Sequence, residues 1–143
     1  MSDLASALTF AVVLPGLLVA HEVGDRWVQT EYQAVTKGHA GHAGRVACVA
    51  HVVTYTVVTA VVVAVLWWVL GLAVSPVGFL VGQAVSAVSH YWIDRRSTLA
   101  WLIDRFLRWK RPYYYDVPGG AEQLDQAAHL VWLFVAALIT AVA

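Results

Sequence analysis

Residues 46–72 read VACVAHVVTYTVVTAVVVAVLWWVLGL and contain no Asp, Glu, Lys or Arg. About 20 consecutive apolar residues are enough for a helix to cross the hydrocarbon core of a bilayer. Valine favours strands in soluble proteins, but an open sheet cannot satisfy its backbone hydrogen bonds in lipid. The stretch therefore predicts a transmembrane helix.

The composition of the whole chain agrees with a membrane setting. Its 143 residues are 60% hydrophobic and 13% charged, with a mean hydropathy of +0.67 and a formal net charge of zero. The charge balance lacks the basic excess of a nucleic-acid-binding surface. The lone Cys48 excludes an internal disulfide and a thiolate zinc site. We expect one transmembrane domain over residues 1–143, with the lipid bilayer as its partner and no nucleic acid.

Three further apolar runs, residues 4–24, 77–93 and 124–142, accompany the first. Together the four predict an all-α, up-and-down four-helix bundle. The first run lacks the basic leader and cleavage pattern of a signal peptide, so we expect it to be retained. The third run is rich in small residues, which let membrane helices approach closely. These are Gly78, Gly82, Ala84, Ser86, Ala87 and Ser89.

The region between the third and fourth runs has an amphipathic pattern. Apolar side chains recur there at helical spacing, at Leu99, Leu102, Ile103 and Phe106. This predicts an interfacial helix over residues 98–110. We expect Ser97 or Thr98 to cap it and Pro112 to end it. A loop of three tyrosines and a Pro-Gly-Gly turn, residues 113–120, is then expected to lie over the end of the bundle.

Topology follows from the basic residues, which occur only in two regions. These are Arg26, Lys37 and Arg45 in the first, and Arg95, Arg96, Arg105, Arg108, Lys110 and Arg111 in the second. By the positive-inside rule, the first and third loops are cytoplasmic and both termini face outward.

Four side-chain pairs with a spacing of four residues mark the ends of the spans. They are His21 with Asp25, His51 with Tyr55, His90 with Asp94, and Asp125 with His129. Such pairs share a helix face, and ionisable groups in membrane segments usually face the interior. In the predicted topology every pair lies at the cytoplasmic end. We therefore expect their four imidazoles and three carboxylates to converge.

Imidazole and carboxylate ligands without thiolates suit zinc, and also manganese or iron. We expect the seven side chains, His21, Asp25, His51, His90, Asp94, Asp125 and His129, to bind one or two ions. An open coordination position would activate water, with Asp25, Asp94 and Asp125 as the catalytic carboxylates. Gln29, Tyr55 and Gln126 lie close to these ligands in the sequence and are expected to orient ligands or water. His39 and His42, in a glycine-rich stretch, are expected to be solvated.

Four short motifs carry a resemblance. They are H-x-x-G-D-x-x-x-Q from His21, H-x-x-x-Y from His51, H-x-x-I-D from His90 and D-Q-x-x-H from Asp125. Together they resemble a family of small bacterial and phage integral membrane proteins classed as a domain of unknown function. More distantly, they are similar to membrane-bound metal-dependent hydrolases. The resemblance implies a multi-pass protein of the bacterial inner membrane. The departures are the stretch 38–44 and Arg26.

Several functions fit this pattern. The favoured one is a metal-dependent hydrolase that acts near the cytoplasmic interface on an amphipathic, lipid-like ester or phosphoester. The alternative is a structural or transport protein, metal-free or metal-bound, whose His and Asp residues lock the helices or relay ions. The outer halves of the spans lack ionisable residues, which disfavours a continuous transport route. A haem-binding electron carrier would use two histidines as axial ligands, but the nearby carboxylates fit haem poorly.

Overall fold

The computed structural model describes residues 2–143 and is helical throughout, with no strand in that part of the chain. The predicted all-α class is thus confirmed. In chain order the elements are α1 (Ser2–Val23), the π-helical turn η1 (Gly24–Val28), α2 (Glu31–Thr36), α3 (Gly41–Leu70), α4 (Pro76–Asp94), α5 (Ser97–Arg105), the short 3₁₀ turn η2 (Arg108–Lys110), α6 (Arg111–Asp116) and α7 (Gly120–Val142).

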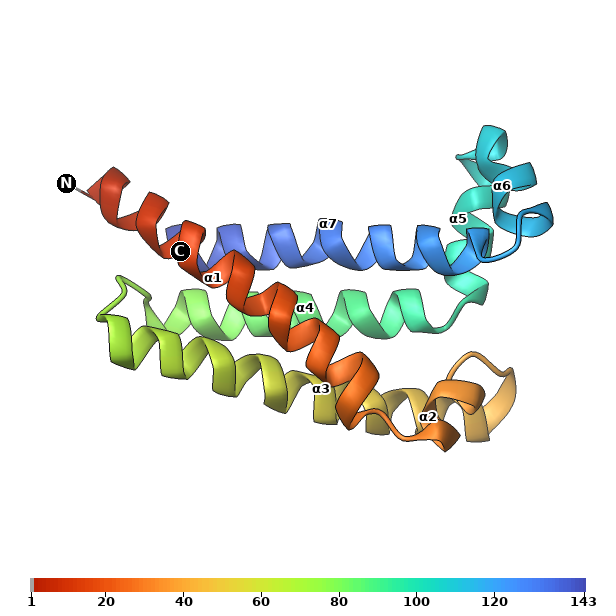
Figure 1. The fold of residues 1–143 in the computed structure, drawn as a ribbon, viewed down its shortest axis with the longest axis horizontal. Helices are drawn as coiled ribbons and strands as arrows, with labels where there is room; N and C mark the ends of the chain where they lie inside the picture. Colours follow the sequence, from red (N-terminus) through yellow and green to blue (C-terminus); the bar gives the residue numbers. More distant parts are fainter. Residues whose placement is uncertain (1) are drawn as a thin grey trace.

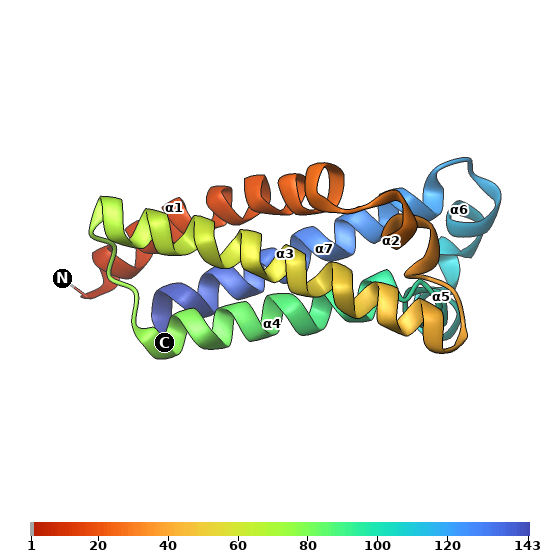
Figure 2. The same ribbon diagram turned by 90° about the horizontal axis from the view of Figure 1, so that it is seen from below.

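The four long helices, α1, α3, α4 and α7, lie side by side (Figure 1). The helices α1 and α4 each contact both α3 and α7, so the four form a closed ring. The short helices α2, α5 and α6 gather at one end, whereas both termini and the turn between α3 and α4 lie at the other (Figure 2). The same end of the molecule as the short helices therefore holds the C-terminal ends of α1 and α4 and the N-terminal ends of α3 and α7.

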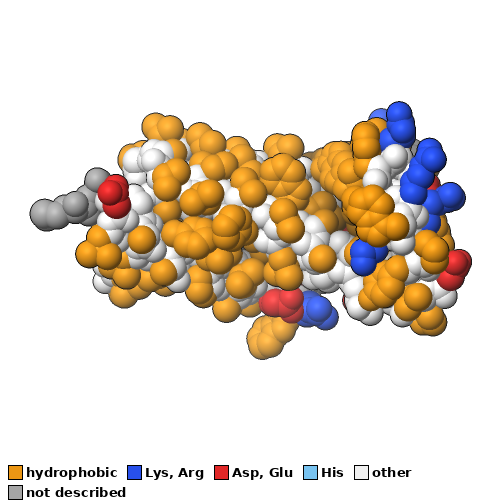
Figure 3. Space-filling view, turned by 90° about the horizontal axis from the view of Figure 1, so that it is seen from above, with side chains coloured by type: hydrophobic (Ala, Val, Ile, Leu, Met, Phe, Trp, Pro, Cys, Tyr) orange, Lys and Arg blue, Asp and Glu red, His pale blue; other side chains and the backbone are white. Residues whose placement is uncertain are grey.

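Three helical segments are long and apolar enough to cross a membrane: Asp3–Val28, Gly41–Leu70 and Gly120–Val142. Hydrophobic side chains cover most of the long body in Figure 3, and Lys and Arg gather near one end. The third expected span, residues 77–93, falls in α4, which is not among the three. Five buried polar residues lie along this helix: Gln83, Ser86, Ser89, His90 and Asp94.

Small residues allow α4 to pack closely against α7, as expected from the sequence. A Cβ added at Gly82 would collide with the Thr140 hydroxyl and lie 3.0 Å from the Ala136 carbonyl oxygen. At Gly78 it would lie 3.0 Å from the carbonyl oxygen of Thr140. Ala84, by contrast, is exposed. Only part of the small-residue set therefore serves this interface.

The interfacial region differs from the sequence prediction. The helix expected over residues 98–110 ends at Arg105, and Pro112 lies in the first turn of the separate helix α6 rather than after a helix end. Proline suits a first helical turn because its missing N–H has no partner there anyway. The three tyrosines expected in a loop belong to α6.

The expected caps of this helix are also wrong. The residue before α5 is Arg96, which has a positive φ of 53° and no side-chain cap. The Thr98 hydroxyl instead donates to the carbonyl oxygen of Trp92 in α4. The chain thus turns sharply at Arg96, and Thr98 ties α5 to the helix that precedes it.

Helix α2 was not predicted, although its start has a sequence signature. Thr30 and Gln33 form a capping box, in which the Thr30 hydroxyl accepts from the Gln33 N–H at 3.2 Å and the Gln33 side chain accepts from the Thr30 N–H at 2.9 Å. A Thr followed three residues later by Gln is the known pattern for this cap. Helix α3 also begins earlier than expected, at Gly41 rather than at residue 46.

Candidate metal centre

The structure brings together all seven side chains that the sequence singled out. They come from the end of α1, from η1, from α3, from the end of α4 and from the start of α7. The four histidines and Asp94 are each no more than 2% exposed. The side chains of Asp25 and Asp125 are 12% and 23% exposed. The site is therefore interior, with its two least buried carboxylates toward the outside.

Local structure explains how Asp25 reaches this centre. It lies in the wider turn η1, which continues α1 and contacts α3. A Cβ on Gly24 would lie 3.0 Å from the ring of Tyr55, so glycine lets η1 approach α3 closely. The π-helical turn then directs Asp25 inward; such turns are frequent at functional sites.

The tightest part of the centre is formed by four atoms. Nε2 of His51 and Nε2 of His90 lie 3.0 Å apart. Oδ1 of Asp25 is 3.3 Å from each of these nitrogens. Oδ2 of Asp94 is likewise 3.3 Å from each. Two ligands of a tetrahedral zinc ion, each at about 2.0 Å from it, are about 3.3 Å apart.

Hydrogen bonding does not account for this cluster. Oδ1 of Asp25 and Oδ2 of Asp94 are buried without a hydrogen-bond partner among the described residues. A single proton between His51 and His90 would satisfy only that pair. The two oxygens and two nitrogens thus converge around one point, and in the tautomer with Nε2 unprotonated all four atoms would be acceptors.

A second group adjoins the first. Nε2 of His129 lies 3.5 Å from Oδ2 of Asp125 and 3.6 Å from Oδ1 of Asp94. This nitrogen also has no hydrogen-bond partner within the described chain. Asp94 therefore directs one carboxylate oxygen to each group and connects them.

Lys37 is a member of the centre that the sequence prediction missed. It follows α2, is only 8% exposed, and places Nζ 2.8 Å from Oδ1 of Asp94. Arg95 holds this segment by donating to the carbonyl oxygens of Lys37, at 2.5 Å, and His39, at 2.7 Å. The local sequence does not distinguish Lys37 from a basic residue that only sets the membrane topology, because its buried contacts are with residues far along the chain.

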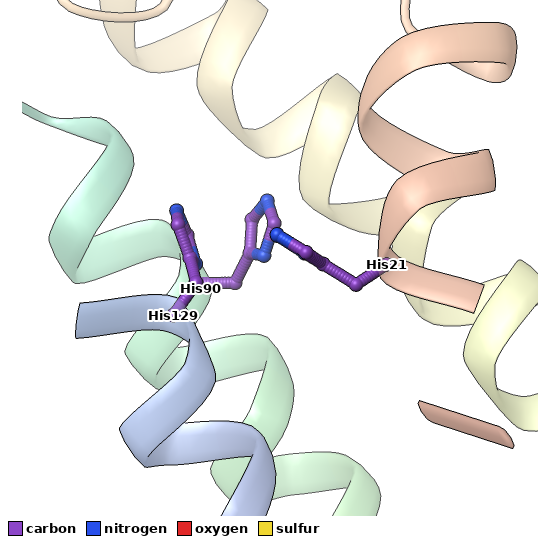
Figure 4. A group of neighbouring side chains, drawn as sticks. All are labelled: His21, His90 and His129. Atoms are coloured by element: carbon purple, nitrogen blue, oxygen red, sulfur yellow. The ribbon is translucent and has the colours of Figure 1, made fainter. Parts of the chain in front are cut away.

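The third histidine group involves His21, as Figure 4 shows. His21, His90 and His129 come from three helices and offer ring nitrogens within 4.8 Å of one another. Nε2 of His21 lies 3.2 Å from Oε1 of Gln126 and 3.8 Å from Oδ2 of Asp25. His21 thus contacts Gln126 more closely than any carboxylate, and Gln126 orients it.

Tyr55 and Gln29, the other polar residues expected to orient the ligands or water, have different surroundings. Tyr55 is fully buried, stacks on the His90 ring with centroids 3.8 Å apart, and pairs its hydroxyl with Oγ of Ser86 at 3.1 Å. Gln29 has a buried amide nitrogen without a hydrogen-bond partner in the described part of the chain. His39 and His42, as expected, are exposed.

The buried polar cluster continues a short way into the bundle, and beyond it the buried polar side chains of the described residues are Thr9 and Thr140. Beyond Tyr55, Thr59 donates to Oε1 of Gln83 at 2.8 Å. The remaining length toward the termini is filled by an apolar core that includes Val13, Leu17 and Leu133. The centre therefore has apolar packing between it and the far end.

A cavity of about 480 Å³ adjoins the centre on the side away from the apolar core. Its walls include the carboxylates of Asp25, Asp94 and Asp125 together with the buried ammonium of Lys37. This cavity gives the polar centre contact with the end of the bundle that carries α2, α5 and α6.

Comparison with known proteins adds a family but no function. No curated protein and no solved structure matches the chain. Residues 13–143 match the family model described as "Protein of unknown function (DUF3307)", and this chain belongs to that family.

Proposed function

We propose that this protein is a membrane metal-binding protein in which Asp25, His51, His90 and Asp94 hold one divalent ion, zinc in the first instance. The observation that carries the proposal is the convergence of two imidazole nitrogens and two carboxylate oxygens at 3.0–3.3 Å. Neutral imidazole and carboxylate groups are suited to zinc, manganese and iron.

The charge of the centre supports a single divalent ion. Asp25, Asp94 and Asp125 contribute three negative charges and Lys37 one positive charge, so that with neutral histidines the sum is −3 + 1 = −2. Buried charges are costly unless they are compensated. One divalent ion neutralises this net charge of −2. The Lys37 ammonium takes the place of a second cation beside Asp94.

Hydrolysis is the reaction that this arrangement favours. A divalent ion held by Asp25, His51, His90 and Asp94 would act as a Lewis acid and activate water at neutral pH by taking it as a fifth ligand. Asp125 and His129, 3.5 Å apart and beside Asp94, are placed to accept the proton of that water. Water and substrate have access through the cavity, whose wall includes Asp25, Asp94 and Asp125. The apolar packing toward the far end favours this one-sided chemistry over transport.

The setting of the site suggests an amphipathic substrate. We place α1, α3, α4 and α7 across the bacterial inner membrane as an up-and-down bundle, with α5 at the interface. The basic regions then lie on the cytoplasmic side and both termini outside. A centre at this end lies next to the membrane surface, where an ester or phosphoester with an apolar tail is accessible.

Elemental analysis of the purified protein tests the metal site. Wild type is expected to contain about one metal ion per chain, and His90→Ala is expected to lose it, because one converging nitrogen is removed. His39→Ala, which changes an exposed histidine, is the matched control and should retain the metal. A metal-free wild type would leave the metal-free helix-locking network as the better account.

Turnover of chromogenic esters tests the hydrolytic step. Para-nitrophenyl acetate reports hydrolysis of a carboxylic ester, and para-nitrophenyl phosphate reports hydrolysis of a phosphate ester. Asp125→Asn is expected to keep the metal and lower the rate by about 10²–10⁴-fold, since it removes a proton acceptor. Equal rates in wild type and Asp125→Asn at equal metal content would contradict this role.

A further inference from the structure

The cavity beside the metal centre has donors that the metal does not use. The best defined is Lys37, whose side chain is 10% exposed and whose Nζ bonds a single carboxylate oxygen, Oδ1 of Asp94. An ammonium group has three N–H donors. Lys37 lines the cavity, so it has donors to spare for a ligand there.

Gln29 supplies an independent observation. Its amide nitrogen is buried and has no hydrogen-bond partner in the described residues, although the side chain lines the same cavity. A buried donor without a partner is destabilising. A ligand with acceptor oxygens in the cavity would remove that cost.

Two more donors line this space. Arg96 contributes a guanidinium group, which suits phosphate geometry. Burial raises the pKa of the Tyr114 hydroxyl, and the charge of Asp125 raises it further. Tyr114 therefore keeps its proton at neutral pH and can donate. Four carboxylates, Asp25, Asp94, Glu122 and Asp125, also line the cavity, beside the cationic side chains of Arg26, Lys37 and Arg96. Of these carboxylates, Asp25 and Asp94 face the metal.

We infer that the cavity binds the phosphate group of the substrate, with Lys37 and Gln29 as its principal donors beside the metal. The substrate class is thus a phosphate ester rather than a carboxylic ester. This inference rests on the proposed function, because the phosphate would lie next to the bound ion. Both a lipid headgroup and a soluble phosphate ester carry the required chemistry.

Isothermal titration of the full-length, zinc-loaded protein in detergent with inorganic phosphate tests the inference. Lys37→Met and Gln29→Glu are expected to weaken phosphate binding at least about tenfold, because each removes a charge-assisted or buried donor and the second adds a repelling carboxylate. Arg108→Met is the matched control. It removes an exposed positive charge outside the cavity and should stay within about twofold of wild type.

Metal analysis of the same samples separates the two proposals. If wild type holds zinc but phosphate does not bind, or both variants bind like Arg108→Met, the phosphate site is wrong and the metal site stands. If wild type holds no zinc, the metal site itself is wrong. Should Lys37→Met fail to fold because its partner Asp94 is buried, Gln29→Glu decides the result alone.

The source of the phosphate is resolved by competition. In nanodiscs of phosphatidylcholine, inorganic phosphate binding is measured with and without phosphatidic acid in the bilayer, and with glycerol phosphate in solution. Displacement by phosphatidic acid alone indicates a lipid headgroup, and displacement by glycerol phosphate indicates a soluble ester. Displacement by neither would overturn the inference.

Discussion

The two halves of the helix bundle are built on different principles. Toward the termini, α1, α3 and α7 contribute Val13, Val63 and Leu133 to an apolar core. Toward α2, α5 and α6, the same helices and α4 turn histidines and aspartates inward. Hydrophobic side chains cover much of the exterior of both halves on the face shown in Figure 3. The apolar half holds the helices in place, and the polar half depends on that alignment to bring its ligands together.

This division makes a specific statement about energetics. Association of helices in lipid depends on packing and polar contacts, because lipid tails are as apolar as leucine. Changes in the apolar half should therefore alter stability without altering the metal content. Changes in the polar half should alter both, since each side chain there has charged neighbours.

The largest effect is expected from Asp94→Ala, which removes the carboxylate shared by both groups. Lys37, whose side chain is 10% exposed, would be left without its partner at 2.8 Å. Breaking a buried ion pair costs about 4 kcal/mol, and the metal should be lost. Denaturation in detergent micelles and elemental analysis measure the two effects.

The control for Asp94→Ala is another ion pair that lies at the surface. Asp104 pairs with Arg111 at 2.8 Å and accepts from the Tyr115 hydroxyl at 3.0 Å, and the side chains of the ion pair are about half exposed. Asp104→Ala should cost at most about 1 kcal/mol and retain the metal. Similar losses from Asp94→Ala and Asp104→Ala would show that the polar half is not specially coupled.

The second effect is expected in the apolar half. Leu133, 2% exposed, is part of the apolar core, and Leu133→Ala should cost about 3 kcal/mol by loss of packing. Metal content should stay at the wild-type level. Leu130→Ala, at a position 50% exposed on the same helix, should change stability by less than about 0.5 kcal/mol. A loss of metal in Leu133→Ala would mean that the halves are not separable.

The third effect probes the α4–α7 contact near the chain termini, in the apolar half. Gly82→Val should cost about 2 kcal/mol, because even a Cβ there meets Thr140 and the Ala136 carbonyl. Ala84→Val, on the exposed side of α4, is the matched control and should be nearly neutral. Unfolding curves of both variants provide the measurement. Equal stability of the two would contradict close packing at Gly82.

Sequence reasoning reached the centre because helical spacing is a local property. His90 and Asp94 are on one face whatever surrounds them, and membrane context directs that face inward. Helical spacing does not predict which of the seven side chains contact one another. These contacts depend on the π-helical turn that directs Asp25 inward and on Gln126, which contacts His21 at 3.2 Å.

The elements between the spans were harder to predict for a related reason. The break after Arg105 and the sharp turn at Arg96 have no strong local signal, and next to that turn Thr98 bonds the Trp92 carbonyl of α4. Lys37 is buried in a segment that is held by residues far along the chain, with its carbonyl oxygen accepting from Arg95 and its Nζ paired with Asp94. By contrast, the capping box of Thr30 and Gln33 is a local signal and was available in the sequence.

The smallest effect is expected where the polar half meets the apolar half, at Tyr55. Tyr55→Phe removes the hydroxyl that pairs with Ser86 at 3.1 Å but keeps the ring stacked on His90. Loss of one buried hydrogen bond should cost about 1 kcal/mol, with the metal retained. Ser86→Ala removes the other partner and should cost a similar amount. If their effects in the double variant do not exceed either single loss, the two residues act only through this bond. Loss of metal in Tyr55→Phe would instead show that the hydroxyl, and not the ring, positions His90.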